Sequence, residues 1–384
     1  MRILHCIDEL ITAGSCRGLI ALAKVMEKRG HSIRVLVARS IDANERYLVD
    51  DLTDYGIQVD SLQWDGKAFG IRSFAAAVWR GRRAIKAINP EILHLHCYMI
   101  EQVVNLGFPL GHLALVTLRT SRPQFGSNRI QHRVRDGLQR MFYKRKRLWL
   151  AALSGALANE TVKGLRLGNK YPVVIPLGLP EFWFSPVLKM AERSLDLVHI
   201  GRADANKNHI LTINALGILA RRGLKLDAVL GGKGSELNRM RKAVSDLNID
   251  SHVHCVGNVE DPESLFRQAR IAVMPSRYEG LGRSCIEALA SGCAFIGSDI
   301  PAFREVLGAG WPGPLLSPEI PKLWADALEH LFMAPDRIEN LGVVGRARVS
   351  GTFTLEREVD DYISLYRRML ESSPISQAPL AVGV

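Results

Sequence analysis

The sequence predicts an α/β protein built from two doubly wound, Rossmann-like domains. Short apolar runs alternate with helical patterns along the first half of the chain, and the alternation starts again at Leu195. Such alternation favours a parallel sheet with helices on both faces. The chain has 384 residues, enough for two domains that each bury a core. We therefore predict an N-terminal domain at 1–178 and a C-terminal domain at 179–354, joined near 176–186.

In the first half, short apolar runs typical of buried strands are separated by longer amphipathic patterns typical of helices. The predicted elements are a strand at 2–7, a helix at 18–29, a strand at 32–38, a helix at 74–88, strands at 92–96 and 113–118, a basic helical stretch, and strands at 148–154 and 173–175.

In the second half, IAVMP at 271–275 predicts a buried strand and SCIEALASG at 284–292 predicts a short helix closed by Gly292. We expect residues 355–371 to form a closing C-terminal helix and 372–384 to be a disordered tail. The other predicted elements are strands at 195–200, 225–230, 253–256 and 294–297, and helices at 210–222, 236–247 and 263–269.

The positive charge is concentrated in the first half. Residues 1–178 hold 27 Lys and Arg against 14 Asp and Glu, a net charge of +13, whereas the remainder holds 23 against 25, a net charge of −2. The stretch 119–150 has ten basic residues and one acidic residue, Asp136. Such a patch binds polyanions, which include nucleic acid, anionic lipid and phosphorylated substrates.

Within that stretch, Lys144, Arg145, Lys146 and Arg147 form a continuous basic run. Apolar and aromatic residues surround the run, which favours docking on a membrane surface over a merely solvated helix face. These apolar neighbours are Phe142, Tyr143, Leu148 and Trp149.

The sequence also indicates the compartment. No apolar run reaches the about 18 residues that span a bilayer, and the chain opens directly into a strand rather than a signal peptide. The six cysteines include no C-x-x-C pair. We expect reduced thiols and a cytoplasmic protein, peripheral on the inner face of the cytoplasmic membrane.

The segment SRYEGLGRSCIEALASG at 276–292 carries two glutamates, Glu279 and Glu287, among small and apolar residues. Glu287 lies on a helix that should be buried nearly all round, where a carboxylate is costly unless a group hydrogen-bonds to it. A ligand could supply that group. The alternative is a structural glutamate that caps a neighbouring loop.

Residues suited to phosphate follow two predicted strands. Arg202 and Lys207, five positions apart after the strand at 195–200, suit a diphosphate, although they could also be solvated loop charges. Gly280, Leu281 and Gly282 precede a helix, whose N-terminus favours a second anion contact. Because carboxylates on either side of a phosphate site bind hydroxyls, we infer a nucleotide-diphosphate sugar as ligand.

These segments resemble the family 4 retaining glycosyltransferases of GT-B fold, of the bacterial cell-surface polysaccharide or lipopolysaccharide type. GRADANKN at 201–208 resembles the family's G-R-x4-K segment, EGLGRSCIE its E-x7-E segment, and RGLIALAKVMEKRGH at 17–31 its first helix. The resemblance covers nearly the whole chain and implies two domains facing a central cleft. It also implies that Arg202 and Lys207 neutralise the diphosphate, that Glu287 binds the ribose hydroxyls and that Glu279 contacts the donor sugar.

Some positions depart from the family's pattern. A Gly-Gly pair in the first loop is replaced by Ala13-Gly14, so Gly14 alone remains for close approach to a substrate, and IPLGLP at 175–180 lacks the usual Asn and Asp. Arg119 stands near a strand end where many members have a histidine. We expect Arg119 to bind an acid or phosphate of the acceptor.

His94 and His96 lie on one face of a predicted strand, at a spacing that a metal could use. The sequence suggests no third ligand, so we expect no zinc site, and His96 is instead an acceptor-side candidate. No D-x-D triplet occurs in the chain. We therefore expect an enzyme without a metal cofactor, in which Arg, Lys and a helix N-terminus stabilise the leaving diphosphate.

The leading hypothesis is a retaining, metal-independent hexosyltransferase that uses a nucleotide-diphosphate sugar, with UDP favoured over GDP. Its acceptor would be lipid-linked or a polysaccharide in cell-surface glycan synthesis. One alternative is a sugar-nucleotide 2-epimerase on the same fold, for which the two motifs are not typical. Another is a polyanion-binding protein that uses the 119–150 patch, but the chain has no nucleic-acid motif, so we expect no nucleic-acid partner.

Overall fold

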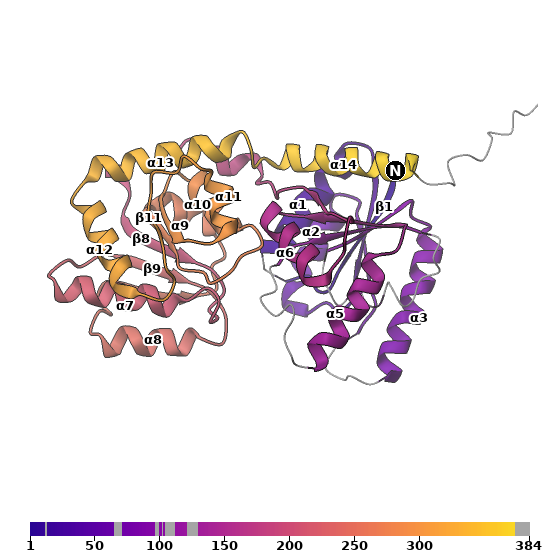
Figure 1. The fold of residues 1–384 in the computed structure, drawn as a ribbon, viewed down its shortest axis with the longest axis horizontal. Helices are drawn as coiled ribbons and strands as arrows, with labels where there is room; N and C mark the ends of the chain where they lie inside the picture. Colours follow the sequence, from indigo (N-terminus) through magenta and orange to yellow (C-terminus); the bar gives the residue numbers. More distant parts are fainter. Residues whose placement is uncertain are drawn as a thin grey trace, which may run out of the picture. The chain divides into compact units, whose positions relative to one another are not determined.

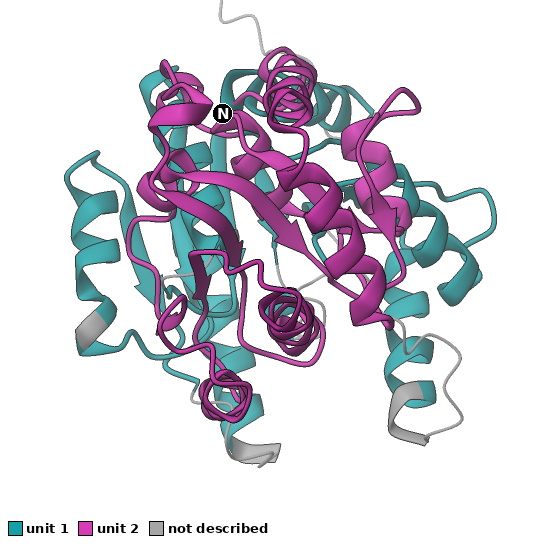
Figure 2. Cartoon of the chain, turned by 90° about the vertical axis from the view of Figure 1, so that its left-hand side faces the viewer, with its two compact units in different colours: residues 1–178, 355–384 teal, residues 179–354 magenta. Residues whose placement is uncertain are grey.

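The computed structural model describes residues 1–372 except 12–13, 65–70, 97–99, 102, 104–111 and 121–129. The chain divides into two compact units, coloured separately in Figure 2. Unit 1 comprises Met1–Gly178 together with Leu355–Val384, and unit 2 comprises Leu179–Thr354. The predicted tail lies, from residue 373 onward, outside the described residues.

Unit 1 contains a seven-stranded sheet with the order β3-β2-β1-β4-β5-β6-β7, and all its strand pairs are parallel. The strands are short runs that are largely buried, as strands covered on both faces must be. They are β1 (Arg2–Ile7), β2 (Ser32–Val37), β3 (Gln58–Ser61), β4 (Ile92–Leu95), β5 (Leu113–Leu118), β6 (Leu148–Ala152) and β7 (Val173–Val174).

Helices bury the two faces of this sheet in two apolar clusters (Figure 1). The last helix of the chain, α14 (Leu355–Glu371), packs against α1 and contributes Tyr362 and Tyr366 to one cluster. The remaining helices of unit 1 are α1 (Gly14–Lys28), η1 (Ala43–Glu45), α2 (Arg46–Thr53), α3 (Ile71–Ile88), α5 (Ile130–Tyr143) and α6 (Gly155–Leu165).

Unit 2 contains a six-stranded parallel sheet with the order β10-β9-β8-β11-β12-β13. Its strands are β8 (Leu195–Ile200), β9 (Ala228–Gly231), β10 (Val253–Gly257), β11 (Ala269–Met274), β12 (Ala294–Ser298) and β13 (Leu315–Leu316). Its helices are η2 (Glu181–Phe184), η3 (Met190–Glu192), α7 (His209–Arg221), α8 (Leu237–Asp246), α9 (Pro262–Gln268), α10 (Arg283–Ala290), α11 (Pro301–Leu307), α12 (Pro321–Phe332) and α13 (Pro335–Ser350).

Both sheets have a point at which the strand order reverses direction. In unit 1 this point lies between β1 and β4, and in unit 2 it lies between β8 and β11. Ligands of doubly wound sheets bind outside the carboxyl ends of the strands at such a point. The loops that follow these strands therefore position the candidate sites.

The predicted doubly wound fold is confirmed, and several elements were missed. The strands predicted at 2–7, 113–118 and 195–200 have the observed bounds. The sequence analysis did not predict α2, β3 and α6 in unit 1 or α11, β13, α12 and α13 in unit 2. Among the helices of the described residues, none combines the length and apolar character needed to cross a membrane.

Candidate functional site

In unit 2, the loops that follow β8 and β9 pack directly against each other. Gly201 donates its N–H to the carbonyl of Gly231 at 2.9 Å, and Ala203 donates to Lys233 at 3.1 Å. A Cβ atom on Gly232 would overlap the carbonyl oxygen of Gly201, so the backbones can approach this closely only with glycine there. The G-K-G segment thus has a packing role.

The loop after β8 is also fastened to the loop after β11. The side chain of Asp204 accepts hydrogen bonds from the N–H groups of Asn206 and Lys207, at 3.1 and 3.0 Å. The Asn206 amide in turn bonds to the backbone of Tyr278 in both directions, at 3.0 and 3.1 Å. These contacts hold Lys207 close to the segment that contains Glu279.

Lys207 and Glu279 form an ion pair through Nζ and Oε1. Their side chains are 18% and 12% exposed, so the pair is largely shielded from water but can still be reached. The two residues are 72 positions apart in the chain. The structure therefore brings together two residues that the sequence analysis placed in one site.

Arg202 lies on the same loop as Lys207 but is much more accessible. Its side chain is 70% exposed, and Nη2 lies 3.0 Å from Oδ2 of Asp204. A surface ion pair of this kind contributes little stability. A bound anion could therefore replace Asp204 as the partner of this guanidinium at small cost.

Glu287 is buried on α10 and has a partner on its own helix. Its side chain is 8% exposed, and Oε1 accepts a hydrogen bond from Nε of Arg283 at 2.7 Å. Part of the hydrogen bonding that we expected from a ligand is thus supplied by a residue one turn earlier. Among the described residues no hydrogen-bond partner of Oε2 is found, which leaves that oxygen for a ligand hydroxyl.

The turn into α10 depends on Gly282. This residue caps the helix with φ of +94°, and a Cβ atom there would clash with the ring of Phe303. Leu281 is buried beside it. Cys285, in the first turn, stays protonated because burial, and then the nearby Glu279, raise the pKa of its thiol.

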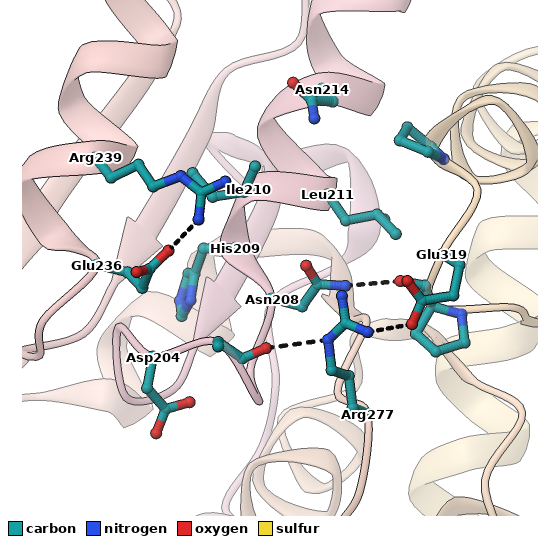
Figure 3. A pocket seen from close by; sticks show the side chains of 13 residues that line it. Asp204, Asn208, His209, Ile210, Leu211, Asn214, Glu236, Arg239, Arg277 and Glu319 are labelled. Atoms are coloured by element: carbon teal, nitrogen blue, oxygen red, sulfur yellow. Dashed lines mark hydrogen bonds and ion pairs between the residues drawn. The ribbon is translucent and has the colours of Figure 1, made fainter.

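A pocket of about 210 Å³ lies beside these loops (Figure 3). Of the residues predicted to bind the donor, none lines it, although Asp204 does. Arg277 crosses it to reach Glu319 and the carbonyl of Ala205, and Asn208 donates to the carbonyl of Pro318 at 2.7 Å. These contacts hold the far side of the loop that carries Lys207.

In unit 1, His96 and Arg119 lie at the carboxyl ends of β4 and β5, two neighbouring strands. Arg119 Nη2 donates to His96 Nδ1 at 2.8 Å. The two acceptor-side candidates are therefore in direct contact. Gly14, the other candidate of this unit, is the first residue of α1, while Ala13 lies outside the described residues.

A third histidine completes a buried cluster, contrary to the expectation that none was available. His5 on β1 is paired in register with His94, and its Nδ1 lies 2.8 Å from Nε2 of His96. Ring nitrogens of all three lie within 4.8 Å of one another. Burial lowers the pKa of His5 to about 3, with a further contribution from Arg119, and lowers those of His94 and His96 well below 6.5.

The nitrogens of this cluster are nevertheless poor metal ligands. Nδ1 of His94 meets Tyr366 Oη at 2.6 Å, and Nε2 meets Thr117 Oγ1 at 2.7 Å. Nδ1 of His96 accepts a hydrogen bond from the Arg119 cation. A metal ion would have to displace these partners and tolerate the guanidinium, so we assign no metal to the cluster.

The basic run after α5 is only partly exposed. Lys144 and Lys146 are exposed, whereas Arg145 and Arg147 are half-buried. The apolar residues around the run do not face solvent as predicted. Phe142, Tyr143 and Leu148 are buried, and Trp149 packs against the core.

A different set of apolar side chains is exposed on α5. Val134, Leu138 and Met141 are 58%, 43% and 52% exposed. Their spacing of four and three residues places them along one face of the helix. The sequence analysis missed this stripe, and also missed Asp204, Asn206, Arg283 and His5 as supporting residues.

Comparison with known proteins shows what the chain is similar to. Residues 184–348 match the family model for glycosyl transferases group 1. The chain is 26% identical over 241 residues to the putative glycosyltransferase EpsD of Bacillus subtilis, covering 58% of this chain and 63% of that protein. It is 28% identical over 274 residues to the D-inositol 3-phosphate glycosyltransferase of Paenarthrobacter aurescens, covering 66% of each. Both alignments thus span slightly less than two thirds of the relative.

The fold has close structural neighbours. The crystal structure of HepE from Anabaena in complex with UDP and glucose superposes with a TM-score of 0.78, at 16% sequence identity, over 96% of this chain and 100% of that one. At this identity the similarity concerns the fold. The fold is thus GT-B, with two Rossmann-like domains, and residues 184–348, which belong to unit 2, carry the similarity to glycosyl transferases group 1.

Proposed function

We propose that the protein is a retaining glycosyltransferase that moves a hexose from a nucleotide-diphosphate sugar to a lipid-linked or polysaccharide acceptor. The observation that carries this proposal is the meeting of Lys207, Glu279 and the turn into α10 at the carboxyl edge of the unit 2 sheet. The donor proposed first is a UDP-sugar, with a GDP-sugar second. HepE, which shares the fold, was crystallised with UDP and glucose.

Each residue of the site has a role in this proposal. Arg202 and Lys207 bind the diphosphate and oppose the negative charge that it gains as the sugar bond breaks. Lys207 exchanges part of its contact with Glu279 for a phosphate oxygen, which frees the carboxylate for a hydroxyl of the sugar. Glu287, held by Arg283, receives the ribose hydroxyls on Oε2.

The proposal includes catalysis without a divalent metal. The leaving diphosphate then relies on the two cations and on backbone N–H groups at the start of α10. The direct test is thermal stabilisation by a panel of nucleotide sugars, measured in EDTA. We expect one UDP-sugar to raise the melting temperature most, and stabilisation that appears only with added Mg²⁺ or Mn²⁺ would contradict the proposal.

We also propose that unit 1 docks on the inner face of the cytoplasmic membrane through α5. The exposed stripe of Val134, Leu138 and Met141 supplies apolar contact. Arg133 and Arg140 on the same helix, and Lys144 directly after its end, are also exposed. An apolar face accompanied by exposed cations suits anionic lipid, where each cation contributes about 1 kcal/mol near the surface.

Vesicle binding tests this docking. We expect salt-sensitive binding to vesicles with anionic lipid, lost when Val134, Leu138 and Met141 are changed to Ser, and weakened when residues 144–147 are changed to Ser. The control removes two other exposed cations of unit 1, with Arg82→Ser and Lys86→Ser on α3. Equal binding to neutral and anionic vesicles, or equal loss in the control, would rule out this surface.

A further inference from the structure

The carboxyl edge of the unit 1 sheet holds a cation that pairs with no carboxylate of the part of the chain that the structure describes. Arg119 is half-buried, and among the described residues it forms no ion pair with a carboxylate. Its Nη2 donates to His96, whereas its Nε is buried and has no hydrogen-bond partner. A buried donor left without an acceptor is costly, so such groups call for an explanation.

The histidine cluster does not supply the missing negative charge. A guanidinium can only donate, so His96 Nδ1 must accept, and the proton of this neutral ring lies on Nε2. Nε2 then donates to His5 Nδ1, which puts the proton of His5 on its own Nε2. That nitrogen is also buried, and the described residues offer it no partner. The hydrogen-bonded series Arg119–His96–His5 thus has at each end a donor for which the described residues offer no acceptor.

The position of Arg119 is that of a ligand site. It directly follows β5, and His96 directly follows β4, the strand at the reversal of strand order in unit 1. The hydrogen bond to His96 fixes one end of the guanidinium plane. The Nε–H group on the other side of the guanidinium still needs an oxygen acceptor, and an oxyanion can supply one.

We propose that Arg119 anchors a phosphate group of the acceptor, with His96 as the positioning residue that holds the guanidinium. This rests on the proposed glycosyltransferase function and narrows its acceptor to a phosphorylated one. A planar guanidinium can bind two phosphate oxygens at once, which a single ammonium cannot do.

The test uses inorganic phosphate as the probe, at constant ionic strength and with UDP present to occupy the diphosphate site of unit 2. Phosphate affinity is measured by thermal shift for the wild-type protein, Arg119→Gln, Arg119→Lys and the matched surface control Arg82→Gln. We expect a loss of about 10- to 100-fold for Arg119→Gln, the equivalent of one charge-assisted contact. Arg119→Lys should lose less, and Arg82→Gln should match the wild type.

Equal phosphate affinity in Arg119→Gln and the wild type would overturn the proposal. If Arg119→Gln does not fold, Arg119→Lys decides, because a wild-type affinity there would contradict the two-oxygen contact. Acetate that stabilises as well as phosphate would also overturn the assignment, in favour of a carboxylate. Failure of the proposed function is separate: UDP would then not bind, while phosphate binding without UDP would still depend on Arg119.

Discussion

The carboxyl edges of the two sheets occupy equivalent places in the fold but differ in how their charged side chains are paired. In unit 2, cations and carboxylates are matched, as in the pairs Lys207–Glu279 and Arg283–Glu287. In unit 1, Arg119 contacts His96, one of three clustered neutral histidines, and no carboxylate partner of Arg119 is found among the described residues. Both edges follow parallel strands at a reversal of strand order.

This difference indicates what each edge can bind. An ion pair between side chains can be replaced by contacts to a ligand. A ligand that carries both phosphates and hydroxyls can therefore bind the cations and the carboxylates at the same time. A cation among neutral rings can only be matched by an anion from outside. The fold is therefore shared, whereas the ligand class is set by a few side chains at the strand ends.

Among the substitutions that test this comparison, Lys207→Ala is expected to have the largest effect. It removes the cation that opposes the charge of the departing diphosphate, and turnover should fall roughly 100-fold or more. Turnover of the best UDP-sugar from the panel, measured with a membrane extract as acceptor source, provides the measurement. Lys225→Ala, which changes an exposed lysine before β9, at the opposite end of that strand from the site, serves as control and should stay within about twofold of wild type, the range usual for surface substitutions. Near-normal turnover in Lys207→Ala would contradict the role.

Substitution of the two glutamates should affect different properties, donor binding in one case and turnover in the other. Glu287→Ala should weaken donor binding by about 1.5–3 kcal/mol, because it removes a charged acceptor for two hydroxyls. Glu279→Ala should reduce kcat more than donor affinity, because its contact tightens as the sugar bond breaks. Calorimetric titration and steady-state kinetics distinguish the two. Glu339→Ala on α13, which removes an exposed carboxylate, is the matched control, and identical profiles for Glu279→Ala and Glu287→Ala would refute the division of roles.

A smaller effect should appear as unequal acid sensitivity of the two units. Three fully buried histidines in unit 1 have pKa values lowered by that burial, and partial burial also lowers the pKa values of His31 and His112. In unit 2 burial lowers the pKa of His209 to about 4 and that of His199 well below 6.5. Each binds a proton more readily when unfolded, so its contribution to stability is present above pH 6.5 and is lost as pH falls toward the folded-state pKa.

Between pH 6.5 and 5, each such histidine lowers stability by up to about 1.4 kcal/mol per pH unit. Unit 1, with three fully buried histidines and two partly buried ones, should therefore lose protection faster than unit 2, with two. Hydrogen exchange by mass spectrometry, corrected for intrinsic rates, measures both units in one sample. Protection that falls equally in both, or not at all, would show that these histidines are not held neutral.

The sequence was sufficient to predict the fold and the proximity of Lys207 and Glu279 in unit 2. Strand ends were recognisable from apolar runs, and Lys207 and Glu279 followed two of them, so their meeting could be expected. The partner of Glu287 also left a signal, since Arg283 precedes it by four residues on a helix. The missed helices α11, α12 and α13 each carry proline at the first turn, a start signal that was available.

The histidine cluster could not be predicted in the same way. His5 meets His96 across a sheet in which β1 and β4 are neighbours although 91 residues separate the two side chains. Only the strand order brings them together. The burial of Phe142 and Tyr143 was missed for a related reason, because the rotation of α5 on the sheet decides which of its apolar residues face solvent.

The central claim is that the nucleotide-diphosphate binds at the unit 2 edge without a metal. The most direct measurement is hydrogen exchange of the wild-type protein with saturating UDP in EDTA. The account predicts protection in the peptides that contain 201–208, 232–236 and 276–290, and none in those that contain 92–96 and 113–119. Protection at the unit 1 edge instead, or protection in unit 2 that requires Mg²⁺, would contradict it.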